Sequence, residues 1–212
     1  MDRRRFLRTL TALPALAVAG QAAAHVCQPH GYHAMSCRVG IDLRQFQYAA
    51  QPQFQSQWCW AACISMLFAH HGFAVSQERI VREVYGAPVN MPAMAGAMIA
   101  GQLNRPWIDD RGRRFNARLG AAYDFDAGFR NLDNHMILAE LAAGRPLVMG
   151  TRNHAIVLTA LDYIPTPMGP NIIGGMAFDP WPGKGLRQLD HSELMAMHMG
   201  GALRFLATMH AA

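Results

Sequence analysis

The chain has 212 residues, of which 51% are hydrophobic and 16% are charged, and its formal net charge is +5. This length is typical of one domain with an apolar core that folds without a metal or a set of disulfides. Residues 1–24 contain four arginines and one aspartate, and removing their net +3 leaves +2. Because no basic cluster with interleaved aromatic residues remains, we expect no nucleic-acid partner.

The first 24 residues have the pattern of a twin-arginine export signal. Arg3 and Arg4 form the pair, an apolar run follows over residues 10–20, and three alanines at 22–24 give a cleavage site. The apolar run has about half the length that a bilayer span requires. We therefore expect a bacterial precursor that binds the twin-arginine export machinery, and a periplasmic or secreted mature protein with no stable membrane anchor. An uncleaved anchor and a frayed basic terminus are the alternatives.

Residues 25–44 form a polar N-terminal segment with two cysteines, Cys27 and Cys37. In an oxidising compartment this spacing predicts a local disulfide loop closed by Cys27 and Cys37, with a bond from either cysteine to Cys63 as the alternative. Metal binding by the two thiols and neighbouring histidines is another interpretation, as is copper chelation by the amine and ring of an N-terminal His25. The spacing matches no zinc pattern, so we predict neither a metal nor a cofactor. The histidines concerned are His25, His30 and His33.

A polar segment with three glutamines ends abruptly at Trp58, and residues 59–68 are apolar apart from Ser65. This pattern predicts a buried helix that begins at Cys59 and stops near Gly72. A thiol in the first turn of a helix faces unpaired N–H groups and the positive end of the helix dipole, which favours the nucleophilic thiolate. The alternative is that Cys59 and Cys63, four residues apart, are two small core residues on one helix face.

The rest of the chain predicts further helices followed by strands. Helices are expected from Ser76 to Tyr85, over residues 92–103, and over 135–143 with Asn134 as the cap. Strands are expected at 115–123, 147–150, 154–163, 175–179, 185–189 and 202–209, with a surface loop at 165–170. The order predicts an α+β fold in which a helical half carries Cys59 and packs against an antiparallel β half, with a cleft between them.

Two later residues complete a reactive set with Cys59. His154 stands at the entrance of an apolar β-rich run, and Asp179 ends a short strand immediately before Pro180. Cysteine, histidine and acid in this order have the chemistry of a nucleophile, a base and a group that orients the base. Individually, His154 is equally well read as a satisfied core histidine and Asp179 as a turn-forming residue.

At these residues the chain resembles the papain-like cysteine peptidases, in particular their compact branch. The resemblance covers residues 45–206, and it implies a papain-like domain over 45–212 that acts on a protein or peptide. Its candidate catalytic residues are Cys59, His154, Asp179 and Gln53. The oxyanion donors would be the Cys59 N–H and the Gln53 amide, with Gln55 and Gln57 as rivals by spacing. The matching motifs are Gln53, Trp58-Cys59-Trp60-Ala61-Ala62, His154-Ala155-Ile156-Val157-Leu158 and Asp179-Pro180-Trp181-Pro182-Gly183.

The sequence therefore predicts an exported bacterial cysteine endopeptidase that hydrolyses peptide bonds through a thioester. Acyl transfer to an amine and glutamine deamidation use the same three residues and remain open. A non-catalytic scaffold that binds a metal or a partner through residues 25–37 is the third alternative. The short interval between Cys59 and His154 departs from the larger papain-type enzymes, so their substrate-binding loops are not carried over.

The export pattern makes one testable prediction. Replacing both arginines, as Arg3→Lys with Arg4→Lys, should retain the precursor in the cytoplasm because the twin-arginine receptor reads that pair. Intact-mass analysis of the unmodified protein in the periplasmic fraction should show a chain beginning at His25. An uncleaved N-terminus in that fraction would contradict the prediction.

Overall fold

The computed structural model describes residues 24–31 and 34–212. The expected export signal up to residue 23 and the proposed metal ligand His33 lie outside the described residues. Within the described part of the chain, no helix is both long and apolar enough to cross a membrane.

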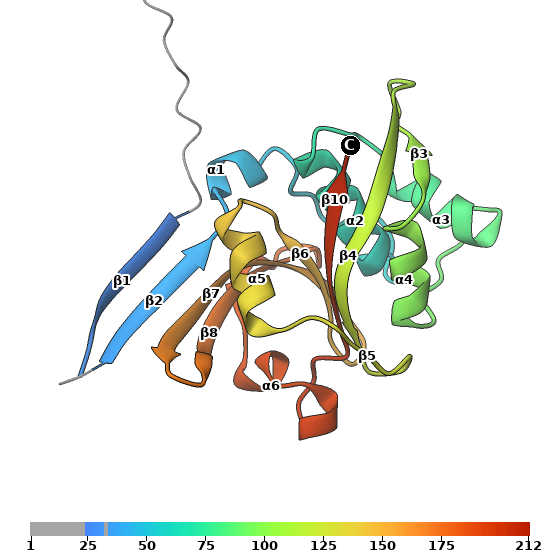
Figure 1. Ribbon diagram of the computed structural model, residues 1–212. Coiled ribbons are helices and arrows are strands. Elements are labelled where there is room, and N and C mark those ends of the chain that lie inside the picture. Colours follow the sequence, from blue (N-terminus) through green and yellow to red (C-terminus); the bar gives the residue numbers. More distant parts are fainter. Residues whose placement is uncertain (1–23, 32–33) are drawn as a thin grey trace, which may run out of the picture.

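The described residues form a mixed α/β fold with six α-helices around a mostly antiparallel sheet (Figure 1). The strand order is β1-β2-β7-β6-β10-β4-β3, with β8 paired to β7, β9 to β8 and β5 to β4. The strands are β1 (Ala24–His30), β2 (Ala34–Gly40), β3 (Pro106–Ile108), β4 (Arg114–Asp124), β5 (Phe129–Arg130), β6 (Leu147–Gly150), β7 (Ala155–Thr166), β8 (Gly169–Asp179), β9 (Gly185–Gln188) and β10 (Phe205–Ala211). The helices are α1 (Leu43–Phe46), α2 (Cys59–His70), α3 (Gln77–Tyr85), α4 (Gly96–Gln102), α5 (Asn134–Ala142), α6 (His191–Leu194) and the 3-10 turn η1 (Met197–Met199).

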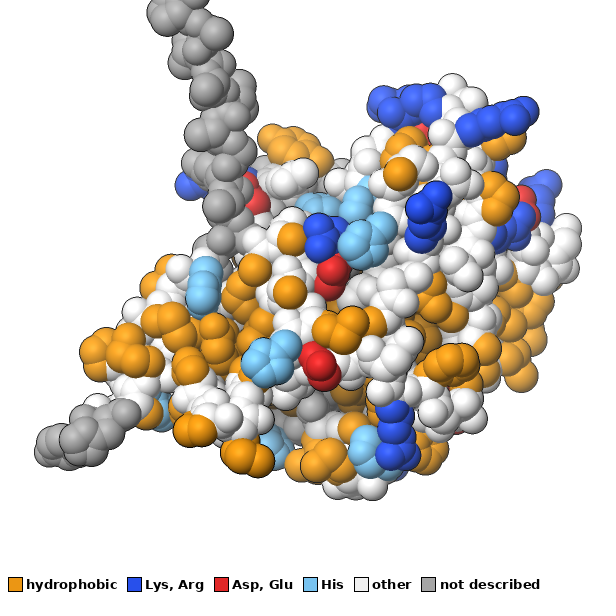
Figure 2. Space-filling view, in the orientation of Figure 1, with side chains coloured by type: hydrophobic (Ala, Val, Ile, Leu, Met, Phe, Trp, Pro, Cys, Tyr) orange, Lys and Arg blue, Asp and Glu red, His pale blue; other side chains and the backbone are white. Residues whose placement is uncertain are grey.

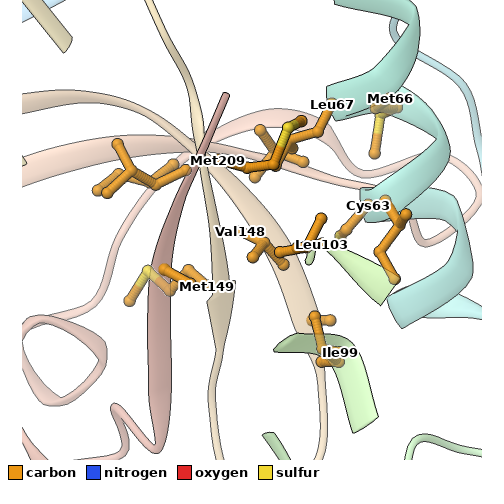
Figure 3. Close-up of a cluster of buried hydrophobic side chains, with 14 of the residues drawn as sticks. Cys63, Met66, Leu67, Ile99, Leu103, Val148, Met149 and Met209 are labelled. Carbon is orange, nitrogen blue, oxygen red and sulfur yellow. The ribbon is translucent and has the colours of Figure 1, made fainter. Parts of the chain in front are cut away.

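The core lies where α2 packs against β6 and β7. Residues 60–68 of α2 are all buried, which fits the all-apolar sequence of this helix. Strand β7 is buried at five consecutive positions from Ala155 because helices cover both of its faces, with α5 in front of the strands in Figure 1 and α2 behind. Figure 3 shows Cys63 and Leu67 of α2 among the side chains of β6, β10 and α4.

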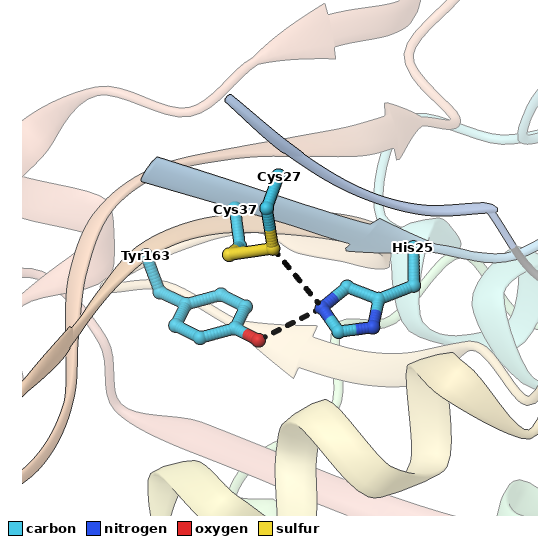
Figure 4. The surroundings of a disulfide bond; sticks show 4 residues. All are labelled: His25, Cys27, Cys37 and Tyr163. Atoms are coloured by element: carbon cyan, nitrogen blue, oxygen red, sulfur yellow. Dashed lines mark hydrogen bonds between the residues drawn. A yellow bond between two sulfur atoms is a disulfide. The ribbon is translucent and has the colours of Figure 1, made fainter. Parts of the chain in front are cut away.

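The N-terminal segment is a β-hairpin rather than a loop. Strand β1 pairs with β2 with Cys27 opposite Cys37, and β2 then pairs with β7, so residues 24–40 extend the main sheet. The disulfide predicted between Cys27 and Cys37 is confirmed. The His25 ring lies beside it and hydrogen-bonds the Tyr163 hydroxyl at 2.9 Å (Figure 4). Because the two sulfurs are bonded to each other, they offer no thiolate to a metal.

Two helix predictions need correction. The helix expected over 92–103 is confined to α4, because Ala95 is extended (φ −157°, ψ 165°) and the Met91 and Pro92 carbonyls accept hydrogen bonds from the Trp60 and Tyr85 side chains of α2 and α3. The cap of α5 is Asp133 rather than Asn134, since the Asp133 carboxylate accepts the N–H of Met136 at 2.8 Å.

The loop expected at 165–170 is a tight hairpin. Strand β7 continues to Thr166 and β8 begins at Gly169, whose φ of 112° favours glycine. The Thr166 hydroxyl accepts the N–H of Met168 and donates to the Gly169 carbonyl. These local hydrogen bonds close a tight turn where an irregular surface loop was expected.

Three arginines around the β3–β4 hairpin form ion pairs with carboxylates. Figure 2 shows Lys and Arg side chains gathered at this upper end of the molecule, with acidic side chains among them. The pairs are Arg79–Asp110, Arg105–Glu83 and Arg113–Asp109, at 2.8, 3.0 and 2.7 Å. Part of the positive charge of this surface is therefore compensated locally.

The hairpin predicts a measurable contribution of the disulfide to stability. Replacing Cys27 and Cys37 together by serine removes the constraint on the unfolded chain and should lower the free energy of unfolding by about 2–3 kcal/mol for so short a loop. Denaturant unfolding of both proteins measures this difference. Non-reducing peptide mapping should find Cys59 and Cys63 free, and a peptide that joins Cys63 to Cys27 or Cys37 would overturn the assignment.

Candidate active site

Cys59 is the first residue of α2, and two buried tryptophans fix the backbone on either side of it. Trp58 is 2% exposed, and its indole N–H donates to the Val89 carbonyl at 2.9 Å. Trp60 is 1% exposed, and its indole N–H donates to the Met91 carbonyl at 3.1 Å. Because both rings are buried and hydrogen-bonded, Cys59 has little freedom to move relative to the segment that carries the two carbonyls.

Asn90 completes this attachment between the two carbonyl groups. Its Oδ1 accepts the backbone N–H of Gln57 at 2.9 Å, and its Nδ2 donates to the Ser56 hydroxyl at 2.9 Å. Trp58 stands at the N-cap position and makes no side-chain cap bond. The N–H groups of the first turn, including that of Cys59, therefore keep the positive end of α2 available to an anion.

His154 and Asp179 meet because they lie at neighbouring strand ends. His154 comes directly before β7, Asp179 is the last residue of β8, and the two strands pair with Val157 opposite Phe178. The His154 Nε2 donates to Asp179 Oδ1 at 2.6 Å, and the Cys59 side chain lies close enough to the same ring to raise its pKa. Cys59 and His154 also line the same cleft, so the structure brings together the three residues that the sequence singled out.

The electrostatics of the pair favour two charged groups. Burial lowers the pKa of His154, but the hydrogen bond to Asp179 and the interaction with the nearby Cys59 side chain outweigh this and raise it from 6.5 to about 9. Burial raises the pKa of Asp179, but the bonds from His154, the Trp181 N–H and Arg187 lower it from 3.8 to about 2. The imidazolium and the carboxylate therefore coexist between about pH 2 and about pH 9.

Cys59 and His154 lie at a cleft of about 570 Å³. One wall is the helical side, with Cys59, residues 92–96 and Ile99, and the other wall is the segment 150–155 with Trp181 and Phe205. Trp181 is 46% exposed, and its ring stands edge-on to that of His154 with 6.5 Å between the centroids. The Cys59 and His154 side chains therefore both line this open cleft.

Gln53 is 5% exposed, and its hydrogen bonds hold the loop before Cys59 in place, which we call its bracing role. Its Nε2 donates to the carbonyls of Gln55 and Ser56 at 2.8 and 3.0 Å, and its backbone N–H donates to the Pro180 carbonyl at 2.8 Å. Its side chain thus stabilises the loop before Cys59, and its backbone ties this loop to the turn after Asp179. Of the rival glutamines, Gln57 lines the cleft.

The sequence did not point to Arg187, Glu193 or Asn90. Arg187 donates from Nε to Asp179 Oδ2 at 3.0 Å and to Glu193 through two further nitrogens. The available signals were the eight-residue spacing from Asp179 across a Pro/Gly turn and the Asp190-x-x-Glu193 capping pattern. Nothing in the local sequence marks Asn90, whose role depends on the distant loop before α2.

Comparisons with protein-family models, with curated proteins and with solved structures found no match to this chain. The resemblance to papain-like peptidases therefore depends on the motifs in the sequence and on the geometry described above.

Proposed function

We propose that this protein is a cysteine hydrolase that cleaves peptide bonds, with Cys59 as the nucleophile, His154 as the acid and base, and Asp179 as the residue that orients His154. The observation that carries the proposal is the placement of the Cys59 thiol beside the His154 ring, which is itself hydrogen-bonded to the buried Asp179. Such an arrangement at the start of a helix and in an open groove supports nucleophilic acyl chemistry.

The proposed reaction steps follow from the charges of Cys59, His154 and Asp179. The Cys59 thiolate attacks the substrate carbonyl carbon, and the N–H of Cys59 stabilises the resulting oxyanion. The His154 imidazolium gives its proton to the departing amine, which leaves a thioester on Cys59. Neutral His154 then takes a proton from water, the hydroxide attacks the thioester, and the released thiolate regenerates the ion pair.

The shape of the groove supports a polypeptide as the substrate. Residues 92–95 of this wall precede α4 without forming a helix, and Met94 on this wall is 66% exposed. An exposed apolar side chain in the groove is a contact that a side chain of a bound polypeptide can use. The thioester can also pass to an amine, and nothing in the described contacts favours that route over water.

The first prediction concerns the reactivity of Cys59. Iodoacetamide at about pH 5.5 should alkylate Cys59 rapidly, whereas an ordinary thiol is about one part in a thousand ionised at that pH. In His154→Ala the rate should fall by about 10²-fold or more because the partner cation is lost. Peptide mapping after timed labelling of both proteins gives the rates.

Cys63 is the internal control for this labelling. It is fully buried, and burial raises the pKa of its thiol well above the usual value, so it should remain unmodified. If Cys59 reacted at pH 5.5 no faster than free cysteine, hydrolysis and acyl transfer would both be excluded. The non-catalytic scaffold would then be the better account.

The second prediction separates the glutamines. If the Gln53 amide leaves the Gln55 and Ser56 carbonyls to bind the oxyanion, Gln53→Ala should lower kcat/KM for a p-nitrophenyl ester by about 10²–10³-fold. Gln55→Ala, the matched control on the same loop, should stay near wild type. An equal loss from Gln57→Ala with little effect of Gln53→Ala would assign the donor to Gln57 and leave Gln53 with its bracing role.

A further inference from the structure

Asp179 is bonded on both of its oxygens, and the second oxygen leads to another ion pair. Arg187 Nε lies 3.0 Å from Asp179 Oδ2, and the other two guanidinium nitrogens each donate to a Glu193 oxygen at 2.8 Å. The side chains of Asp179, Arg187 and Glu193 are 7%, 26% and 12% exposed. The charges therefore alternate along a mostly buried row from His154 to Glu193.

The β8–β9 hairpin builds this row. Asp179 pairs with Gly185, and Arg187 pairs with Ala177, so Arg187 is the diagonal cross-strand neighbour of Asp179 on the same face of the sheet. Glu193 lies in α6, where its carboxylate also accepts the Asp190 N–H in a capping box. The row is thus fixed by strand register at one end and by a helix cap at the other.

Arg187 and Glu193, at the outer end of the row, both keep their charge over the pH range in which the His154 imidazolium and the Asp179 carboxylate coexist. The two hydrogen bonds to Glu193 raise the pKa of Arg187 further, and the bonds from Arg187 are the main cause that lowers the pKa of Glu193. The groups that face the His154 ring directly are Cys59 from α2 and Asp179 from β8. Two further cations, Arg152 and Arg204, line the cleft, and Arg204 is paired with Asp126.

The positive charge of Arg187 interacts with the same carboxylate that stabilises the His154 imidazolium. Arg187 therefore reduces the stabilisation of the ring proton by Asp179, and the negative charge of Glu193 offsets part of that reduction. A ring that binds its proton too tightly transfers it poorly to a leaving group, so this balance matters for general acid catalysis.

We propose that Arg187 is a positioning residue that sets the proton affinity of His154 through Asp179, and that Glu193 limits its effect. The inference rests on the proposed function, because it concerns the proton that this thiol chemistry must transfer. It assigns Arg187 and Glu193 opposite electrostatic effects on one imidazole, which a purely structural salt bridge would not have.

Alkylation of Cys59 by iodoacetate as a function of pH tests this directly. Iodoacetate is an anion, so the alkylation rate falls as His154 loses its positive charge. The alkaline limb of the plot of rate against pH therefore reports the deprotonation of His154. In Arg187→Gln this limb should move upward by about half to one pH unit, and in Glu193→Gln it should move downward by a similar amount. Arg187→Lys keeps the charge and should remain near wild type.

Arg145→Gln is the matched control, because Arg145 also makes a two-point ion pair, with Glu140 at 2.6 and 2.8 Å and comparable exposure of 32% and 15%. It should leave the limb unchanged. Shifts of Arg187→Gln and Glu193→Gln in the same direction, or no shift in either, would overturn the inference while fast wild-type labelling upheld the proposed function. If Arg187→Gln failed to fold by near-ultraviolet circular dichroism, the sign of the Glu193→Gln shift alone would decide. Slow wild-type labelling with no bell-shaped profile would overturn both.

Discussion

The buried carboxylate of Asp179 is the constraint on which the site depends. A charge that is 5% exposed must be matched by donors, and here they come from three directions: the His154 ring, the Trp181 N–H and the Arg187 guanidinium. Loss of one partner from such a buried set leaves charge uncompensated, which typically costs about 3–5 kcal/mol. The requirement to satisfy Asp179 therefore fixes the β7 entrance, the turn after β8 and the start of β9 relative to one another.

The same turn also positions Cys59. The Pro180 carbonyl accepts the backbone N–H of Gln53, so the loop before α2 is bonded to the residue that follows Asp179. On its other side this loop is held by Asn90 and by the two indole N–H bonds that flank Cys59. The thiol and the carboxylate lie 120 positions apart in the chain, yet short hydrogen-bonded paths connect both to the same turn.

Sequence patterns predicted the elements whose signals are local. The mainly apolar run after Cys59, the glycine after α3 and the β-rich run after His154 each mark an element that the structure contains. Errors occurred where tertiary contacts decide the conformation. Residues 92–95 look helical but are not, because the Met91 and Pro92 carbonyls accept bonds from side chains of other helices, and residues 24–40 look like a loop but find strand partners. Arg187 was missed for the same reason, since its partners depend on strand register.

The central claim is that Cys59 and His154 exist as a thiolate–imidazolium pair that performs nucleophilic acyl chemistry. The most direct measurement is the far-ultraviolet absorption of the thiolate, taken as the difference between the protein and Cys59→Ser across a pH titration. The account predicts that the band is fully developed at mildly acidic pH and is lost at that pH in His154→Ala. A band that develops only in the alkaline range of an ordinary thiol, in both proteins alike, would contradict it.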